Sequence, residues 1–359
     1  MRRGVPAGSG TRGGLYSDPS AYLGARGNAS LPFATGQSLV PALTDAVVGG
    51  PGGYVISSSL VRSVTLPDGR TLAYDEYGDP DGVPFVFMHG IPSSRFAARM
   101  IADAAARVGV RLIAPDRPGY GCSDPFPKRT LLDWPRDVEA LADALDLDEF
   151  GVIGISGAVP YLLACAVAIP DRLSHVAILS GLGPLREPGV MEGMNRETAT
   201  LYRLALRSPR MARVWMAMLA KTTKHSPHLV YRQQLGYLPE VDRAVFDGPG
   251  MREHRLVDFA EAFRQGADGP SREAVLHMTD WGFALCDVSL DVFIWQGALD
   301  RHHPIAMGRY LERDIVGAHA VFVPEVGAFG FVDRMDDVFE QLLDVPARAA
   351  ALTEPARRA

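Results

Sequence analysis

The sequence contains few cysteines and few lysines. Its three cysteines (Cys122, Cys165 and Cys286) are widely spaced, and no CxxC pair occurs among the 359 residues. This argues against a disulfide framework or a structural zinc site and favours a reducing cytoplasm. Three lysines stand against 33 arginines. We attribute this bias to a GC-rich bacterial genome rather than to phosphate binding.

The chain also lacks an excess of positive charge. Its formal net charge is −6 and its pI is about 5.9, so no global basic field favours nucleic acid as a partner. Hydrophobic residues make up 47% and charged residues 22%, which excludes a wholly disordered chain, a collagen or a coiled coil. No metal-ligand spacing or phosphate-binding loop is evident, so we expect neither a metal nor an organic cofactor.

Signals for export or for membrane insertion are missing as well. Met1, Arg2 and Arg3 precede Gly, Pro and Ser rather than an apolar segment, so no signal peptide is expected. The uncharged run 151–170 is long enough to span a bilayer, but it contains Ser156 and Pro160. We interpret it as a buried strand, a tight turn and a buried helix. The expected partner is a small, apolar substrate and no membrane, and the oligomeric state is left open.

Strand and helix patterns alternate through most of the chain, which predicts an α/β fold with a mostly parallel sheet covered by helices on both faces. Between residues 183 and 285 the pattern is purely helical, including an apolar spacing that runs through 202–219, and this predicts an inserted helical cap. The expected organisation is a disordered or arm-like leader (1–53), a core (54–182 and 286–345), the cap (183–285) and a tail (346–359). Within the core we expect strands at 85–88, 111–114, 150–155, 176–179, 290–295 and 320–323, and helices at 95–108, 134–145, 157–169, 305–315 and 332–343.

The segment Gly154-Ile155-Ser156-Gly157-Ala158 lies between a predicted strand and a predicted helix. In that context a tight turn exposes the serine hydroxyl and points the amide N–H of Gly157 at a developing oxyanion. Ala158 stands where the pattern G-x-S-x-G has its last glycine. A second oxyanion N–H is expected from Ile91, which follows His89-Gly90 at the end of another strand. We expect His89 to hydrogen-bond within its own loop.

In this order the motifs resemble the α/β-hydrolase superfamily. They comprise His89-Gly90, the segment Asp116-Arg117-Pro118-Gly119-Tyr120-Gly121, the Ser156 turn, and Gln296-Gly297-Ala298-Leu299-Asp300 after the cap. The resemblance implies that Ser156 is the nucleophile and that Asp300 orients a histidine base. Similar family members place that base directly after a glycine in the loop that follows the last strand. Here the matching residue is Ala328, so the expected base is absent.

Another histidine can replace the missing base. His302 and His303 lie two and three residues after Asp300, in a loop that should face the site, and we name His302 as the candidate. His277, near the return of the cap to the core, is a weaker one. Aromatic and methionine residues of the cap can line an apolar pocket, or pack as ordinary core between helices (Met191, Met194, Trp215, Met216, Met218, Trp281 and Phe283).

Four functional hypotheses follow. The first is an enzyme that acts on a small or medium apolar ester or acyl substrate by a non-standard reaction (elimination, cyclisation or acyl removal), because the usual base is absent. The second is an ordinary esterase-like hydrolase with a relocated base such as His302. The third is a ligand-binding protein that has lost catalysis, and the fourth is a chain whose histidine was deliberately replaced. A role in bacterial secondary metabolism is an association from composition alone.

Overall fold

The computed structural model describes residues 37–40 and 61–345. Most of the predicted leader and all of the predicted tail lie outside these ranges. Within the leader, only strand β1 (Gln37–Val40) is described, and it pairs antiparallel with β2 (Val61–Thr65).

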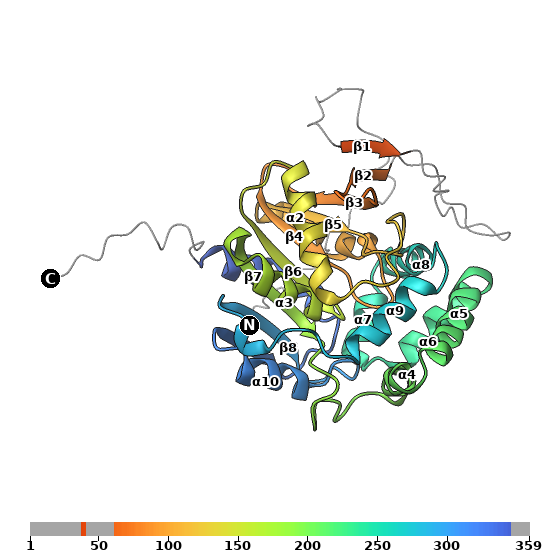
Figure 1. Cartoon of the computed structure of the whole chain (residues 1–359). Helices are drawn as coiled ribbons and strands as arrows, with labels where there is room; N and C mark the ends of the chain where they lie inside the picture. Colours follow the sequence, from red (N-terminus) through yellow and green to blue (C-terminus); the bar gives the residue numbers. More distant parts are fainter. Residues whose placement is uncertain (1–36, 41–60, 346–359) are drawn as a thin grey trace, which may run out of the picture. The chain divides into compact units, whose positions relative to one another are not determined.

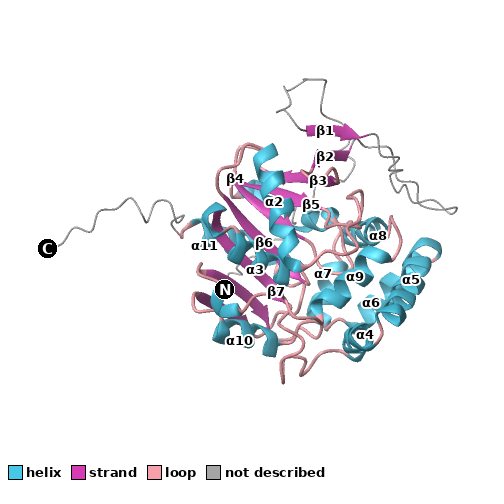
Figure 2. Cartoon of the chain, in the orientation of Figure 1, coloured by secondary structure: helices cyan, strands magenta, loops and turns pink. Residues whose placement is uncertain are grey.

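A nine-stranded sheet forms the centre of the described chain (Figures 1 and 2). Its order is β1-β2-β3-β5-β4-β6-β7-β8-β9, with antiparallel pairing from β1 to β5 and parallel pairing from β5 onward. Because parallel strands end at the same edge, residues that follow β4, β6, β8 and β9 gather there. The remaining strands are β3 (Thr71–Gly78), β4 (Val83–Met88), β5 (Val110–Pro115), β6 (Phe150–Ser156), β7 (Leu173–Gly181), β8 (Val292–Gly297) and β9 (Ala318–Val323).

Helices cover both faces of the sheet, as the alternating pattern predicts. Helices α2 (Trp134–Ala144), α3 (Val159–Ala168) and α10 (Ile305–Asp314) pack into one apolar cluster with one sheet face. Helices α1 (Ala102–Arg107) and α11 (Met335–Leu343) pack into a second cluster on the other face. The uncharged run 151–170 is therefore a buried strand, a turn and a buried helix. No described helix is long and apolar enough to cross a membrane.

Six helices between β7 and β8 form the cap (Figure 1). They are α4 (Arg196–Arg207), α5 (Pro209–His225), α6 (Pro227–Tyr237), α7 (Glu240–Phe246), α8 (Met251–Ala262) and α9 (Asp268–His277). Two of the predicted helical stretches are each divided between two helices. The apolar spacing through 202–219 is divided between α4 and α5, because Ser208 caps α5 and Pro209 begins it. The helix expected at 95–108 begins as a 3₁₀ helix (Arg95–Ile101) before α1.

Candidate active site

Ser156 lies at the carboxyl end of β6, where the chain turns into α3. Its backbone has φ +64°, a left-handed conformation that non-glycine residues adopt rarely and that often marks functional sites. The side chain is only partly buried. The chain thus makes the tight turn at this serine that the sequence pattern predicts.

The departure from the motif at Ala158 is accommodated by packing. Ala158 is fully buried at the start of α3. A Cβ on Gly154 would lie 2.8 Å from the Ala158 methyl group and 2.6 Å from Leu162. The first glycine of the motif therefore provides the space, and Ala158 leaves the turn intact.

An imidazole contacts the nucleophile, and it belongs to His303. Its Nε2 lies 3.1 Å from Ser156 Oγ, within hydrogen-bond distance. Its Nδ1 lies 3.6 Å from Oδ2 of Asp300, which is beyond hydrogen-bond distance, and neither of these two buried atoms has a hydrogen-bond partner among the described residues. The other carboxylate oxygen accepts the backbone N–H groups of His302 and His303. Serine, imidazole and carboxylate thus follow one another in the order that nucleophilic catalysis requires.

His302, the residue named from sequence, faces the cap instead. Its Nδ1 lies 3.0 Å from the Asn195 side-chain amide and 3.3 Å from the Thr198 hydroxyl. Burial lowers the pKa of His302 to about 4, although the charge of Asp300 acts in the opposite direction. The choice of His302 was wrong because adjacent residues in a loop direct their side chains differently. The sequence alone does not show which of the two histidines faces Ser156.

The loop after β9, where the family base is expected, is instead hydrogen-bonded to Asp242 of the cap. Ala328 is 4% exposed. The buried carboxylate of Asp242, on cap helix α7, accepts the backbone N–H groups of Ala328, Phe329 and Gly330 at 2.8, 3.1 and 3.2 Å. Burial raises the pKa of Asp242, and Asp300 adds to this effect. Sequence reasoning missed Asp242, because nothing in the pattern links a cap helix to this loop.

Two backbone amides flank the nucleophile. A Cβ on Gly157 would lie 2.7 Å from the Ile91 side chain, so the two residues adjoin. Among the described residues, neither of these two amide N–H groups donates to a backbone carbonyl in a turn, loop or cap. The sequence predicts both as donors to an oxyanion, and this role stays a prediction. The nearby His89 is buried and uses both ring nitrogens within the core, through Gly90 O and the Arg117 amide.

His277 lies behind the turn rather than in front of it. A Cβ on Gly157 would lie 2.7 Å from its Cε1 atom. Its Nδ1 is 3.3 Å from the Tyr202 hydroxyl, and its Nε2 is 3.9 Å from Glu273. Burial, with the charge of Arg117, holds the pKa of His277 well below its ordinary value. His277 therefore packs against the peptide that carries one of the two amides.

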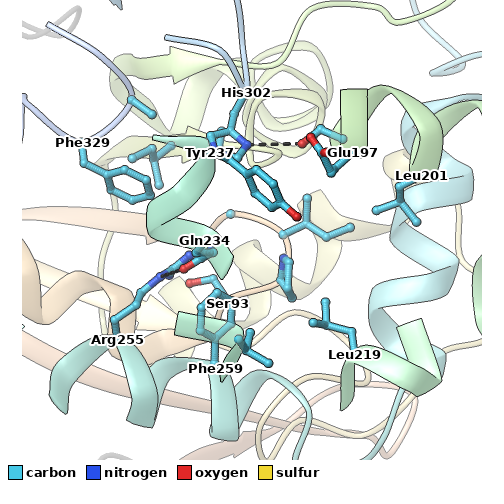
Figure 3. A pocket seen from close by; sticks show the side chains of 18 of the residues that line it. Ser93, Glu197, Leu201, Leu219, Gln234, Tyr237, Arg255, Phe259, His302 and Phe329 are labelled. Atoms are coloured by element: carbon cyan, nitrogen blue, oxygen red, sulfur yellow. Dashed lines mark hydrogen bonds between the residues drawn. The ribbon is translucent and has the colours of Figure 1, made fainter. Parts of the chain in front are cut away.

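Ser156 and His303 line a cavity of about 260 Å³. Figure 3 shows other side chains that line it. Apolar side chains from the cap form much of its wall, whereas Ser93, Gln234 and Arg255 make one polar side. Arg255 forms an ion pair with Asp258, and burial lowers its pKa. The apolar residues lining the cavity include Ile91, Leu201, Tyr202, Trp215, Leu219, Val230, Phe259 and Phe329. Of the seven cap residues considered from sequence, only Trp215 lines this cavity.

Buried carboxylates of the cap hold it against the core loops. Removing one partner from such a buried contact is costly, so these contacts fix the cap over the site. No described group of three or more His, Cys, Asp or Glu side chains is arranged to hold a metal ion. The carboxylate contacts are Asp242 with the loop after β9, Asp258 with Ser93 and Ser94, Glu261 with Arg95, and Glu273 with Arg117.

Comparison with known proteins identifies the fold family. A family model of the alpha/beta hydrolase fold matches residues 83–334. The chain is 33% identical over 154 residues to a non-heme chloroperoxidase of Streptomyces lividans, covering 41% of this chain and 55% of that protein. It is 30% identical over 148 residues to epoxide hydrolase B of Mycobacterium tuberculosis, covering 39% and 40%. The chain therefore spans about half or less of the length of these curated relatives.

Solved structures extend the similarity over most of the chain. A hydrolase from Pseudomonas aeruginosa matches with a TM-score of 0.58 at 19% identity, covering 79% of this chain and 98% of that one. The enol-lactonase from Burkholderia xenovorans matches with a TM-score of 0.56 at 18% identity, covering 79% and 98%. At these identities the similarity concerns the fold alone.

Proposed function

The chain belongs to the α/β-hydrolase family, and we propose that it is a serine hydrolase that cleaves small or medium apolar carboxylic esters. In this proposal Ser156 is the nucleophile, His303 the general base and Asp300 the residue that orients the imidazole. The amides of Ile91 and Gly157 form the oxyanion hole.

The observation that carries the proposal is the contact of 3.1 Å between His303 Nε2 and Ser156 Oγ. A serine hydroxyl is a weak nucleophile at neutral pH and needs an adjacent base. The non-standard reaction expected from the sequence was motivated by the absence of a base. With an imidazole beside the serine, ordinary ester hydrolysis is the simpler reaction.

The reaction proceeds in two halves. Ser156 Oγ attacks the acyl carbonyl carbon while His303 takes the hydroxyl proton, and the two amides stabilise the oxyanion. When the tetrahedral intermediate collapses, the ester C–O bond breaks and His303 returns the proton to the leaving alcohol. Water, deprotonated by His303, then attacks the acyl-enzyme and releases the carboxylic acid and Ser156.

The cavity supports the substrate class. Its volume of about 260 Å³ and its walls of Leu, Val, Trp and Phe side chains suit an acyl or alkyl group of modest size. The polar side around Arg255 suits a carbonyl or hydroxyl group at a distance from the scissile bond.

Hydrolysis of a p-nitrophenyl ester series from acetate to decanoate tests the proposal. We expect kcat/KM to be highest for short and medium acyl chains and to fall to background in Ser156→Ala. Ser180→Ala is the matched control, because Ser180 is a buried serine that also has a positive φ (+44°). Tight binding of a substrate analogue without turnover of any ester would instead favour a ligand-binding protein.

A further inference from the structure

The outermost cap helix, α5, is apolar on two faces. Its inner face packs Ala212, Met216 and Thr223 into the cap. Its outward side exposes apolar residues at the helical spacing i, i+3, i+4 and i+7, which places them in one stripe. The exposed fractions are 51% for Met211, 50% for Val214, 39% for Trp215 and 67% for Met218.

Each of the two neighbouring helices also exposes an apolar side chain. Leu206 on α4 and Leu229 on α6 are 50% and 49% exposed, and both helices contact α5 (Figure 1). We call these six residues (Leu206, Met211, Val214, Trp215, Met218 and Leu229) the outer cap face. Apolar side chains gathered in this way on a soluble protein mark an interaction site more often than single exposed residues do.

The same helices carry a concentrated positive charge. From Arg196 to Tyr237 the sequence has six arginines and two lysines but a single acidic residue, Glu197, whereas the whole chain has a net charge of −6. All eight basic side chains are exposed. Arg213 pairs with Asp268 of α9. The basic residues are Arg196, Arg203, Arg207, Arg210, Arg213, Lys221, Lys224 and Arg232.

The outer cap face is continuous with the cavity above Ser156. Trp215 belongs to the exposed stripe and also lines the cavity, as does Leu219 one helical turn further along α5. A surface bound to this face would therefore lie beside the cavity through which an apolar substrate reaches the nucleophile.

We propose that the outer cap face docks the protein on anionic lipid surfaces. Helix α5 exposes Met, Val and Trp side chains and also carries Lys and Arg, a combination that is typical of helices that lie in the membrane interface. Anionic headgroups attract such basic residues. A second copy of the chain is a poorer occupant, because a symmetric contact would bring the two basic surfaces together. This proposal departs from our expectation that the protein has no membrane partner, and it does not depend on the proposed reaction.

Vesicle co-sedimentation of the full chain tests the docking. Vesicles of pure phosphatidylcholine are compared with vesicles containing about one third phosphatidylserine, at low and at physiological salt. We expect at least tenfold tighter binding to the anionic vesicles, weakened by salt. The double variants Met211→Gln/Met218→Gln and Lys221→Glu/Lys224→Glu should each lose about tenfold of this affinity.

Matched controls use residues outside the cap. Val316→Gln changes an apolar side chain that is 87% exposed, and Arg334→Glu reverses an exposed charge near α11. Both controls should bind as the parent does, and the far-UV circular dichroism and thermal unfolding midpoint of every variant should match those of the parent, which verifies folding. Equal binding to both vesicle types, or none, overturns the proposal. So does a dimer that the cap variants dissociate, or binding to polyglutamate but not to vesicles.

Discussion

The loops that follow β8 and β9 lie at the same edge of the sheet but differ in chemistry. The loop after β8 carries Asp300 and His303, and its imidazole contacts Ser156. The loop after β9 carries Ala328, where the sequence resemblance predicts the family base, and its backbone is held by Asp242 from the cap. One loop thus supplies both the acid and the base of the proposed triad, while the other has become an anchor for the cap.

In the proposed triad, the position of the base in space matters more than its position in the sequence. Asp300 and His303 are three residues apart, so the backbone N–H of His303 can bind Asp300 Oδ1 while its ring approaches Oδ2. The family pattern requires two loops to be positioned against each other. Here Asp300 and His303 both lie in the loop after β8. The loop after β9 instead binds Asp242.

The largest expected effect is the loss of the base. His303→Ala should lower kcat for ester hydrolysis on the order of 10³-fold or more, because no other imidazole contacts Ser156 in the described structure. KM should change little. Steady-state kinetics check this, and activity within tenfold of the parent would mean that another group takes the proton.

A histidine introduced at position 328 tests whether the loop after β9 can still supply a base. In the His303→Ala background, Ala328→His should recover activity by about tenfold or more, because Ala328 lines the same cavity as Ser156. Ala328→Asn in that background is the control for size and polarity. Equal rates for the two double variants would show that the loop after β9 no longer directs a side chain at the nucleophile.

Replacing Asp242 tests whether its contacts with the loop after β9 stabilise the fold. Asp242→Ala leaves three backbone N–H groups of residues 328–330 without their acceptor, and it should lower the free energy of unfolding by about 2–4 kcal/mol. Asp247→Ala, at an exposed position after the same helix, should change it by less than about 0.5 kcal/mol. Urea denaturation measures both, and similar values would mean that the Asp242 contacts do not stabilise the fold.

The smallest effect is expected at His302. His302→Gln should change kcat/KM less than about threefold, because its Nδ1 faces Asn195 rather than Ser156. The pKa of His302 is lowered from 6.5 to about 4, so folding favours the neutral ring. Its contribution to stability is present above pH 6.5 and is lost as the pH falls toward 4. His302→Gln should therefore flatten the decline of stability in this window, which thermal unfolding at several pH values detects.

Much of the fold and part of the site could be predicted from the sequence. Hydrophobic periodicity predicted the sheet and the cap, and the Gly-rich turn predicted the conformation of Ser156, because both signals are local. The choice between His302 and His303 depends on side-chain directions in a loop that has no periodicity. The contact of Asp242 with Ala328 joins residues 86 positions apart and has no local signature.

The most direct test of whether His303 activates Ser156 is the rate at which a fluorophosphonate probe labels Ser156 at pH 7. The probe reacts with a serine only where a base and an oxyanion hole activate it. We expect rapid labelling of the parent and of His302→Gln, and labelling slowed at least about a hundredfold in His303→Ala. Equal labelling of the parent and His303→Ala, or slow labelling in His302→Gln alone, would contradict this expectation.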